Sequence, residues 1–247
     1  MTHPHPSTAL VVGASGGIGN AVLTQLLDDT GFDAVWAVSR SPAPPDFPHG
    51  HTCARWLQCD NSAASIADCV ARLKQENAAL RRVVICSGVL HNERVQPEKS
   101  LEQLHRDAML EVLDANAVTP ALWLSALAAL LKRDADSVIA VLNARVGSIE
   151  DNRLGGWYSY RASKAALNML MKTAAIELAR RAPGVKLLAF HPGTTDTALS
   201  RPFQKNVPEG KLFSPAFVAE RLLSLMDTLP RDSSLAYLDW DAQPIPW

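Results

Sequence analysis

The sequence predicts an α/β fold, a single doubly wound parallel sheet with helices on both faces. Three observations predict it. Short apolar or β-branched runs lack polar alternation, which is typical of strands buried on both faces of a parallel sheet. Stretches of helical periodicity separate these runs, so the order β–α recurs along the chain. A glycine-rich turn stands at the first strand–helix junction, which is typical of a Rossmann-type sheet.

Each element follows from its local pattern. Strands are expected at 9–12, 34–38, 83–86, 138–142, 186–190 and 235–238. Helices are expected at 18–27, 62–75, 101–113, 120–132, 160–181 and 215–229.

Two regions interrupt the alternation. Residues 41–51 carry four prolines and are expected to form a surface loop. Residues 194–214 follow a strand end, where ligands bind in open α/β sheets, so they form either a mobile substrate loop or a plain connection. The chain has no internal repeat or linker composition. Residues 1–247 are therefore expected to form one domain.

Composition excludes several classes of partner. The chain has 247 residues, 24 basic against 25 acidic, and a formal net charge of −1, so neither nucleic acid nor an anionic membrane is an expected partner. The longest apolar run, 120–131, is shorter than the ~20 residues that cross a bilayer. The N-terminus lacks the pattern of a secretory signal. A soluble, cytoplasmic protein is expected.

The cysteines indicate a reducing compartment rather than a metal site. Neither CxxC spacing nor paired histidines accompany them, so free thiols and no bound metal are expected. The four are Cys53, Cys59, Cys69 and Cys86.

The glycine-rich turn predicts a phosphate loop. Glycines allow a tight turn and a close approach of backbone N–H groups to a pyrophosphate, and the following helix offers its positive N-terminal end. Two spacings fit, Gly13-Gly17-Gly19 and Gly13-Gly16-Gly19, and the loop alone does not choose between them. The residues expected to contact the cofactor here are Gly13, Ser15, Gly16, Gly17, Ile18 and Gly19.

The end of the second strand indicates which dinucleotide binds. An NAD site usually places Asp or Glu there for the ribose 2′-OH. This chain has Ser39 and Arg40 instead, and a guanidinium pairs well with a 2′-phosphate. We therefore expect NADP, or its reduced form NADPH, with Ser39 and Arg40 as ligands.

A tyrosine and a lysine four residues apart form the candidate catalytic pair. Tyr160 and Lys164 share one face of the predicted helix 160–181. A nearby ammonium favours the phenolate, so Lys164 is expected to lower the pKa of Tyr160 toward the range useful for proton transfer. Tyr158 competes for the role, but Ala162 stands four residues after it.

Six elements in this order resemble the short-chain dehydrogenase/reductase family, and the resemblance spans nearly the whole chain. They are GASGGIG at 13–19, Asp60-Asn61, Cys86-Ser87-Gly88, Asn116, Tyr160-Arg161-Ala162-Ser163-Lys164 and the PGTTDT element at 192–197. The resemblance implies further cofactor contacts from Asp60, Asn61, Ser87, Gly88, Tyr160, Lys164, Pro192, Gly193, Thr195 and Thr197.

The resemblance also implies a reaction. Tyr160 would give a proton to the oxygen of a small carbonyl substrate, Lys164 would lower its pKa and hold the nicotinamide ribose, and Asn116 would support a relay water. The reverse reaction would oxidise an alcohol. The segment 155–169 and the ending QPIPW resemble the carbonyl-reductase branch that includes the C-factor proteins. Members of the family often form homodimers or homotetramers through the helices carrying Asn116 and Tyr160.

One departure from the family pattern bears on activity. The family serine aligns with Ala144, whereas counting back twelve residues from Tyr160 reaches Ser148. Asn143, Ser148 or a backbone N–H would have to replace the lost donor, which is worth on the order of 10²–10³ in rate. Two alternatives to an enzyme of this kind follow: a nucleotide-binding signalling protein with little turnover, and a sugar-nucleotide epimerase. Trp157, Phe203 and Phe213 line an apolar pocket or serve as ordinary packing.

Overall fold

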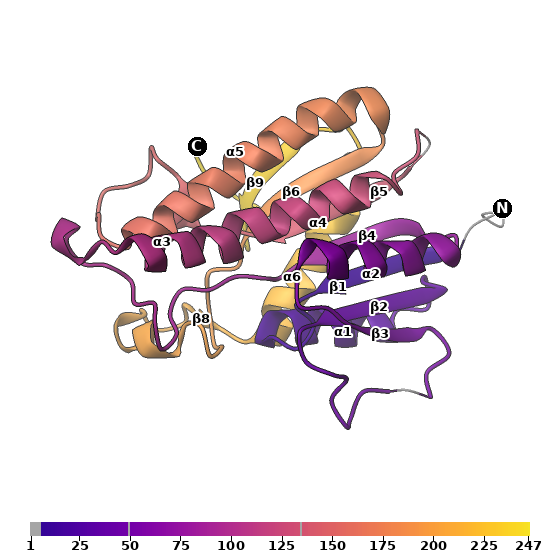
Figure 1. Ribbon diagram of the computed structural model, residues 1–247, viewed down its shortest axis with the longest axis horizontal. Helices are drawn as coiled ribbons and strands as arrows, with labels where there is room; N and C mark the ends of the chain where they lie inside the picture. Colours follow the sequence, from indigo (N-terminus) through magenta and orange to yellow (C-terminus); the bar gives the residue numbers. More distant parts are fainter. Residues whose placement is uncertain (1–5, 49, 134) are drawn as a thin grey trace.

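A single parallel sheet organises the chain in the computed structural model, which describes residues 6–48, 50–133 and 135–247 (Figure 1). Within these residues the sheet has seven strands in the order β3-β2-β1-β4-β5-β6-β9, all paired in parallel. The strands are β1 (Ser7–Val12), β2 (Ala34–Ser39), β3 (Ala54–Gln58), β4 (Ala79–Ile85), β5 (Ser137–Leu142), β6 (Val185–His191) and β9 (Leu235–Asp239). The order reverses between β1 and β4, as in doubly wound sheets, so the predicted fold class is confirmed.

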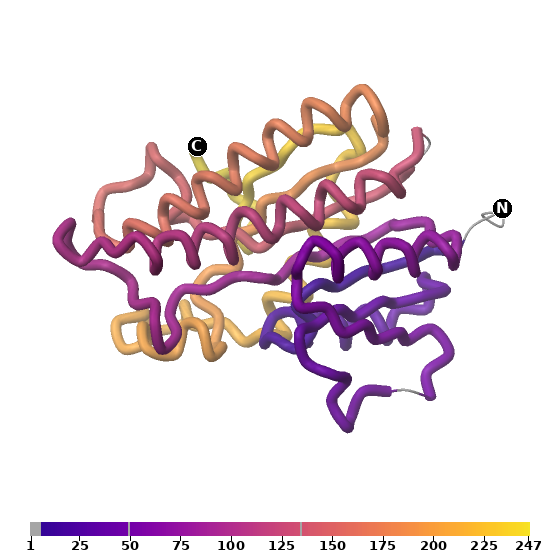
Figure 2. Tube along the Cα trace, viewed as in Figure 1, coloured from indigo at the N-terminus to yellow at the C-terminus, as the bar shows by residue number. Residues whose placement is uncertain are grey.

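Helices cover both faces of this sheet and bury two hydrophobic cores. On one face α1 (Gly17–Asp28) and α6 (Pro215–Thr228) contribute Leu26 and Met226 to the core. On the other face lie α2 (Ala63–Gln75), α4 (Thr119–Ala128) and α5 (Tyr158–Arg181). Strands sandwiched in this way need apolar residues on both faces, which is why β2 is buried at all six positions. In the chain path of Figure 2 the indigo N-terminal strands lie at one end of the sheet, and the orange segments of α5 and β6 lie at the other.

Apart from shifts of up to four residues at element ends, the structure differs from the sequence expectations in three ways. Strand β3 was not expected; it is an edge strand whose Arg55 and Trp56 are only half-buried, so its apolar signal is weak. The helix expected at 101–113 is a short 3₁₀ turn, η1 (Leu101–Gln103), followed by α3 (Arg106–Leu113). From α3 the chain continues through a π-helical turn, η2 (Asp114–Val118), into α4.

The two regions without periodicity also have distinct structures. The described residues of 41–51 hold no helix or strand, as expected. Residues 194–214 form a segment with three short elements: β7 (Thr194–Thr195), the 3₁₀ helix η4 (Arg201–Asn206) and β8 (Leu212–Phe213). Strands β7 and β8 pair in parallel, apart from the main sheet.

Two further properties of the fold bear on the sequence expectations. The four cysteines are unpaired, as predicted, and burial raises the pKa of Cys69 and of Cys86 to about 12, so both stay protonated at neutral pH. Within the described ranges no helix is both long enough and apolar enough to cross a bilayer.

Candidate active site

The glycine loop between β1 and α1 is shaped by the absence of side chains. Gly13 has φ +82°, a conformation that favours glycine, and its N–H donates to Val38 O at 2.9 Å. A Cβ at Gly19 would lie 2.2 Å from Gly13 O, and one at Gly17 would lie 2.7 Å from Thr197 Cγ2. A Cβ at Gly16 would meet nothing closer than 3.4 Å. The closest packing therefore falls at Gly13, Gly17 and Gly19.

This loop faces a cavity that fits a dinucleotide. Helix α1 starts at Gly17, and its N-cap Gly16 supplies no side-chain cap, so the helix N-terminus is free to bind an anion. The cavity beside it measures about 1010 Å³. Expected cofactor residues that line it are Gly13, Ser15, Gly16, Ser39, Arg40, Asp60, Asn61, Ser87 and Gly88.

The end of β2 places a hydroxyl pair and a guanidinium at one end of this cavity. Ser39 is buried, and its hydroxyl lies 2.7 Å from the Ser15 hydroxyl. Arg40 follows with an exposed side chain. A phosphate at this position would meet two hydroxyl groups and one unburied positive charge, the donor set that a 2′-phosphate needs.

The ends of β3 and β4 complete the cofactor wall. The Ser62 N–H donates to Asp60 Oδ1 at 2.8 Å, and hydrogen bonds from Ser62 lower the pKa of Asp60. Asn61 has φ +67°, and its Oδ1 accepts from Trp123 Nε1 at 2.9 Å. The buried Ser87 hydroxyl finds no hydrogen-bond partner among the described residues, so it is available to a ligand in the cavity.

Asn116 lies in the π-helical turn η2 and is fully buried. Its Oδ1 accepts from Val89 N at 2.7 Å, and its Nδ2 donates to Val89 O at 2.8 Å and to Ser163 Oγ at 3.1 Å. The Ser163 hydroxyl in turn donates to Tyr160 O at 2.8 Å. This chain of hydrogen bonds fixes η2 against the start of α5, where the tyrosine and lysine lie. π-helical turns are frequent at functional sites.

Tyr160 and Lys164 come together on α5 as predicted from their spacing. Lys164 Nζ lies 5.8 Å from the centroid of the Tyr160 ring and donates to Leu142 O at 2.9 Å. A Cβ at Gly88 would lie 3.1 Å from Asn116 Oδ1 and 3.7 Å from Lys164 Nζ. Asn116 and Lys164 therefore lie directly behind Gly88, which lines the cavity, although the cavity lining does not include Asn116, Tyr160 or Lys164 themselves.

The expected lowering of the pKa of Tyr160 is not found in this structure. Burial, and secondarily the neighbouring Tyr237, raise the pKa of Tyr160 above its ordinary value. Burial also lowers the pKa of Lys164 to about 8, because a buried ammonium loses its hydration. The lysine lies over the tyrosine ring, and its own charge is disfavoured by burial. A tyrosine in this state keeps its proton at neutral pH.

The segment after β6 closes the site from the other side. Gly193 has φ +70°, and a Cβ there would lie 2.7 Å from the Phe213 ring. The Thr197 side chain contacts the phosphate loop at Gly17. Ser200 holds the segment in place, since its hydroxyl donates to Thr195 O. Pro192, Gly193, Thr195 and Thr197 thus follow the strand end beside the loop, although the cavity lining does not include them.

The position of the family serine is occupied by a side chain without a polar group. Ala144 is buried, and its carbonyl accepts from the Tyr237 hydroxyl at 2.6 Å. The two candidate substitutes are engaged elsewhere. Asn143 Nδ2 donates to Asn168 Oδ1 at 2.5 Å, and the Ser148 hydroxyl pairs with Trp247 O and accepts from Asp151 N.

Two residues that support the site were not found from the sequence. Glu98 is buried, and its carboxylate accepts hydrogen bonds from the Ser159 N–H at 3.2 Å and from the Ser159 hydroxyl. It stands in a loop with no motif, so no local signal marks it. Tyr237 supports the Ala144 carbonyl from β9, a contact between distant parts of the sequence.

The three aromatic residues expected near the site separate into two groups. Trp157 and Phe203 contact each other with ring centroids 5.1 Å apart. Phe213 instead packs on Phe217 and Trp240 at 5.1 and 4.4 Å. Phe213 therefore belongs to the packing beneath Gly193, while Trp157 and Phe203 lie together near Tyr160.

A parallel doubly wound sheet with a phosphate loop after β1 and a tyrosine–lysine pair on the helix after β5 defines a class of dinucleotide-dependent oxidoreductases. A model of the short chain dehydrogenase family matches residues 7–208. The chain belongs to this family, whose members are oxidoreductases that act on carbonyl and alcohol groups, and the predicted resemblance is confirmed.

Individual relatives agree with this assignment. The chain is 29% identical over 246 residues to 1-hydroxy-2-glutathionyl-2-methyl-3-butene dehydrogenase of Rhodococcus sp. (strain AD45), covering 98% of this chain and 100% of that one. It is 31% identical over 139 residues to the C-signal protein of Myxococcus xanthus, covering 56% and 78% of the two chains. The NADPH-bound carbonyl reductase from chicken fatty liver has the same fold, with a TM-score of 0.82, 23% identity and coverage of 100% and 96%.

Proposed function

We propose that the protein is an NADPH-dependent carbonyl reductase, and that Tyr160 is its proton donor. The observation that carries the proposal is the place of Gly88 on the cavity wall, where an added Cβ would lie 3.1 Å from Asn116 Oδ1 and 3.7 Å from Lys164 Nζ, beside Tyr160. When bound, NADPH supplies the hydride for the carbonyl carbon. The Arg40 guanidinium and the hydroxyls of Ser15 and Ser39 support the choice of NADPH.

Each side chain has a part that its surroundings favour. Tyr160 keeps its proton at neutral pH because burial raises its pKa, so it is suited to donate that proton to the carbonyl oxygen. The Lys164 ammonium stabilises the phenolate left behind and, with its remaining N–H groups, binds the ribose. Asn116 holds η2 and the Val89 segment together, which keeps Gly88 against Lys164 and supports a relay water.

The same proposal covers the assembly. Residues 1–247 act as one dinucleotide-binding domain with a substrate loop at 194–214. Apolar side chains on η2, α4 and α5 remain exposed, and they favour a homodimer or homotetramer through these helices. They are Val118, Leu122, Met169, Leu170 and Ile176. Light scattering on the purified protein measures the oligomeric state, and a monomer at all concentrations contradicts this part.

The test of the chemistry follows NADPH absorbance with a panel of aldehydes, ketones and quinones. Tyr160→Phe is expected to lower kcat by on the order of 10²–10⁴ while leaving the Kd for NADPH unchanged, because only the transferred proton is lost. Tyr158→Phe is the matched control. Tyr158 is the first residue of the same helix, two residues before Tyr160, and this variant is expected to keep activity. Loss of activity in the control alone would reassign the proton donor.

One observation favours a second candidate function. Ala144 lacks the hydroxyl expected at its position, and the C-signal relative gives a precedent for a signalling member of this family. A nucleotide-binding regulatory protein with little turnover would bind NADPH tightly and reduce no carbonyl in the panel. That result would replace the reductase proposal with this one.

A further inference from the structure

The segment that enters α5 stores backbone strain next to Tyr160. Gly155, Gly156 and Trp157 all have positive φ values, of 64°, 64° and 53°. Glycine adopts this conformation freely, but for a bulky side chain it is a strained outlier. Such strain persists where the surrounding structure enforces it, and it often accompanies a functional position.

A buried carboxylate residue enforces the conformation of Trp157. The Trp157 N–H donates to Glu98 O at 2.5 Å, and the Glu98 side chain binds the N–H and hydroxyl of Ser159. A buried carboxylate is costly unless its oxygens accept hydrogen bonds, and both oxygens of Glu98 do so here. Glu98 thus fixes the residues on each side of Tyr158 and sets the direction of the Trp157 side chain.

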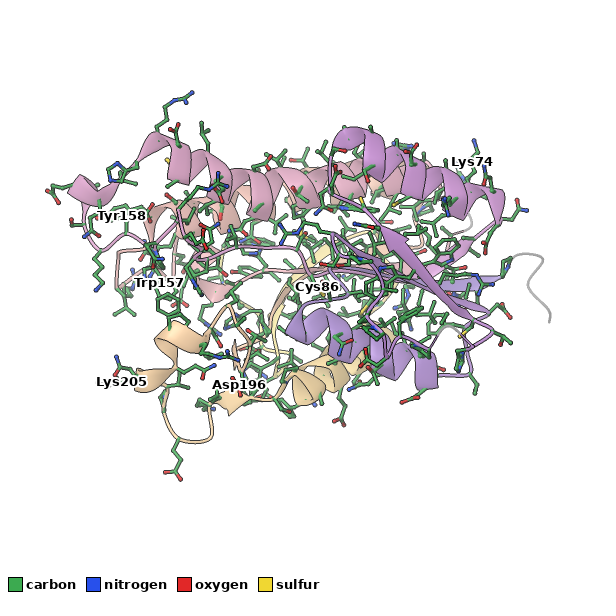
Figure 3. All side chains as sticks on the ribbon, turned by 60° about the horizontal axis from the view of Figure 1, so that its bottom comes forward. Lys74, Cys86, Trp157, Tyr158, Asp196 and Lys205 are labelled. Carbon is green, nitrogen blue, oxygen red and sulfur yellow. The ribbon has the colours of Figure 1, made fainter. Side chains whose placement is uncertain are left out.

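The Trp157 ring belongs to a line of rings between the cavity and Tyr160. Its centroid lies 6.1 Å from that of Tyr160 and 5.1 Å from that of Phe203. Phe203 lies 5.6 Å from His91, which lines the cavity and whose Nε2 is 3.2 Å from Leu199 O. Figure 3 shows Trp157 at the start of α5, facing the turn that carries the labelled Lys205.

These rings are not part of the packing that holds the fold together. Trp157 and Phe203 are half-buried and lie outside the two hydrophobic cores of the described chain. A half-exposed ring pair, held by strain beside the proton donor, presents an apolar surface with aromatic faces. An aromatic ring that packs on such a surface is stabilised by ring–ring contact beyond the burial of its area.

We propose that Trp157 and Phe203 bind the aromatic group of the substrate, which is an aryl ketone or aryl aldehyde. The carbonyl oxygen meets the Tyr160 hydroxyl, and the aryl ring adjoining the carbonyl packs on Trp157 and Phe203. This inference rests on the proposed reductase function and adds the substrate class to it.

The test compares acetophenone with cyclohexyl methyl ketone, which has a similar size but no aromatic ring. The ratio of their kcat/KM values in a variant is divided by the ratio in the wild type, so the intrinsic reactivity of the two ketones cancels. Trp157→Leu and Phe203→Leu are each expected to lower this quotient by roughly two- to tenfold, mainly through KM. Trp157→Phe, which keeps an aromatic ring, is expected to retain most of the preference.

The control and a second measurement separate the possible failures. Trp247→Phe alters an aromatic ring that contacts Tyr237 instead, and its quotient is expected to stay near one. Calorimetry measures binding of both ketones to the complex with NADP⁺, where no turnover occurs. Circular dichroism checks that each variant is folded, and Phe203→Leu stands in for Trp157→Leu if the latter fails to fold.

The outcomes then decide between the two proposals. Reduction of both ketones with an unchanged quotient in Trp157→Leu and Phe203→Leu overturns the aryl-binding surface and leaves the reductase proposal standing. Absence of turnover with NADPH bound overturns the reductase proposal. In that case weaker calorimetric binding of acetophenone to the leucine variants still supports the aryl surface, and equal binding overturns it.

Discussion

The two halves of the candidate site lie at the same edge of the sheet but recognise ligands in different ways. The cofactor half, between β1 and the end of β4, is shaped by missing side chains, since a Cβ at Gly19 would lie 2.2 Å from Gly13 O. The substrate half, from η3 (Arg145–Gly147) to η4, is shaped by large side chains such as Trp157 and Phe203. The first half is fixed by backbone geometry, while the second can change its ligand without changing the fold.

The largest effect is expected from a substitution that adds a side chain to the glycine loop of the cofactor half. Gly19→Ala places a Cβ against Gly13 O, so the loop must open, and we expect the Kd for NADPH to rise more than about a hundredfold and stability to fall by roughly 1–3 kcal/mol. Fluorescence titration and thermal unfolding measure the two effects. Gly50→Ala is the control, because a Cβ there meets nothing within 4 Å. Unchanged NADPH affinity in Gly19→Ala would contradict the claim that the cofactor half is shaped by the absence of side chains.

A smaller effect is expected where the cofactor half does depend on a side chain. Arg40→Asp removes a charge-assisted contact to the 2′-phosphate and should raise the Kd for NADPH roughly ten- to hundredfold, with little change for NADH. Arg106→Asp makes the same charge change at an exposed position on α3 and should leave both affinities unaltered. Equal weakening by the two variants would point to overall charge rather than to a phosphate ligand.

In the substrate half, adding a hydroxyl should raise the rate. Ala144→Ser restores a donor at the family's serine position, and we expect kcat to rise at least roughly tenfold, because Asn143 and Ser148 are engaged elsewhere and do not supply that donor. Ser148→Ala should leave kcat nearly unchanged, since its hydroxyl binds Trp247 O and Asp151 N. A hundredfold loss in Ser148→Ala would show that Ser148, not position 144, contacts the substrate.

The smallest effect is a pH dependence set by Lys164. Its pKa of about 8 means that the ammonium charge is lost as the pH rises through that value, so kcat/KM should fall roughly fourfold between about pH 7 and about pH 8.5. The free energy of unfolding should rise with pH between about 8 and about 10.4, because only the unfolded lysine still holds its proton there. Lys164→Arg keeps the charge and should flatten both profiles; an unchanged profile would assign the titration to another group.

The sequence predicted the fold and most of the cofactor half because their signals are local. The phosphate loop occupies consecutive residues, and the helical spacing of Tyr160 and Lys164 brings them together as expected. Strand β3 was not predicted from the sequence, because an edge strand that carries Arg55 and Trp56 lacks a continuous apolar run. The roles assigned to the individual cofactor and catalytic residues stay predictions.

The supports of the substrate half had no local signal. Ser148 is engaged by the carbonyl of Trp247, 99 residues away, and Glu98 reaches Ser159 across 61 residues. The left-handed conformation of Trp157 depends on the Glu98 carbonyl, so no propensity of the tryptophan itself predicts it. The pKa of Tyr160 was misjudged for a related reason, because the extent of its burial follows from tertiary packing.

The π-helical turn η2 makes the position of Asn116 depend on the number of residues between α3 and α4. The N–H of Thr119 donates to Asp114 O, five residues back, so the turn holds one residue more than an α-helical path would. Each residue of an α-helix turns the chain by about 100°. Deleting Ala115 would allow one uninterrupted helix and rotate α3 by that angle relative to α4. Chain length at this point therefore sets the phase between the two helices, and through it the orientation of the amide.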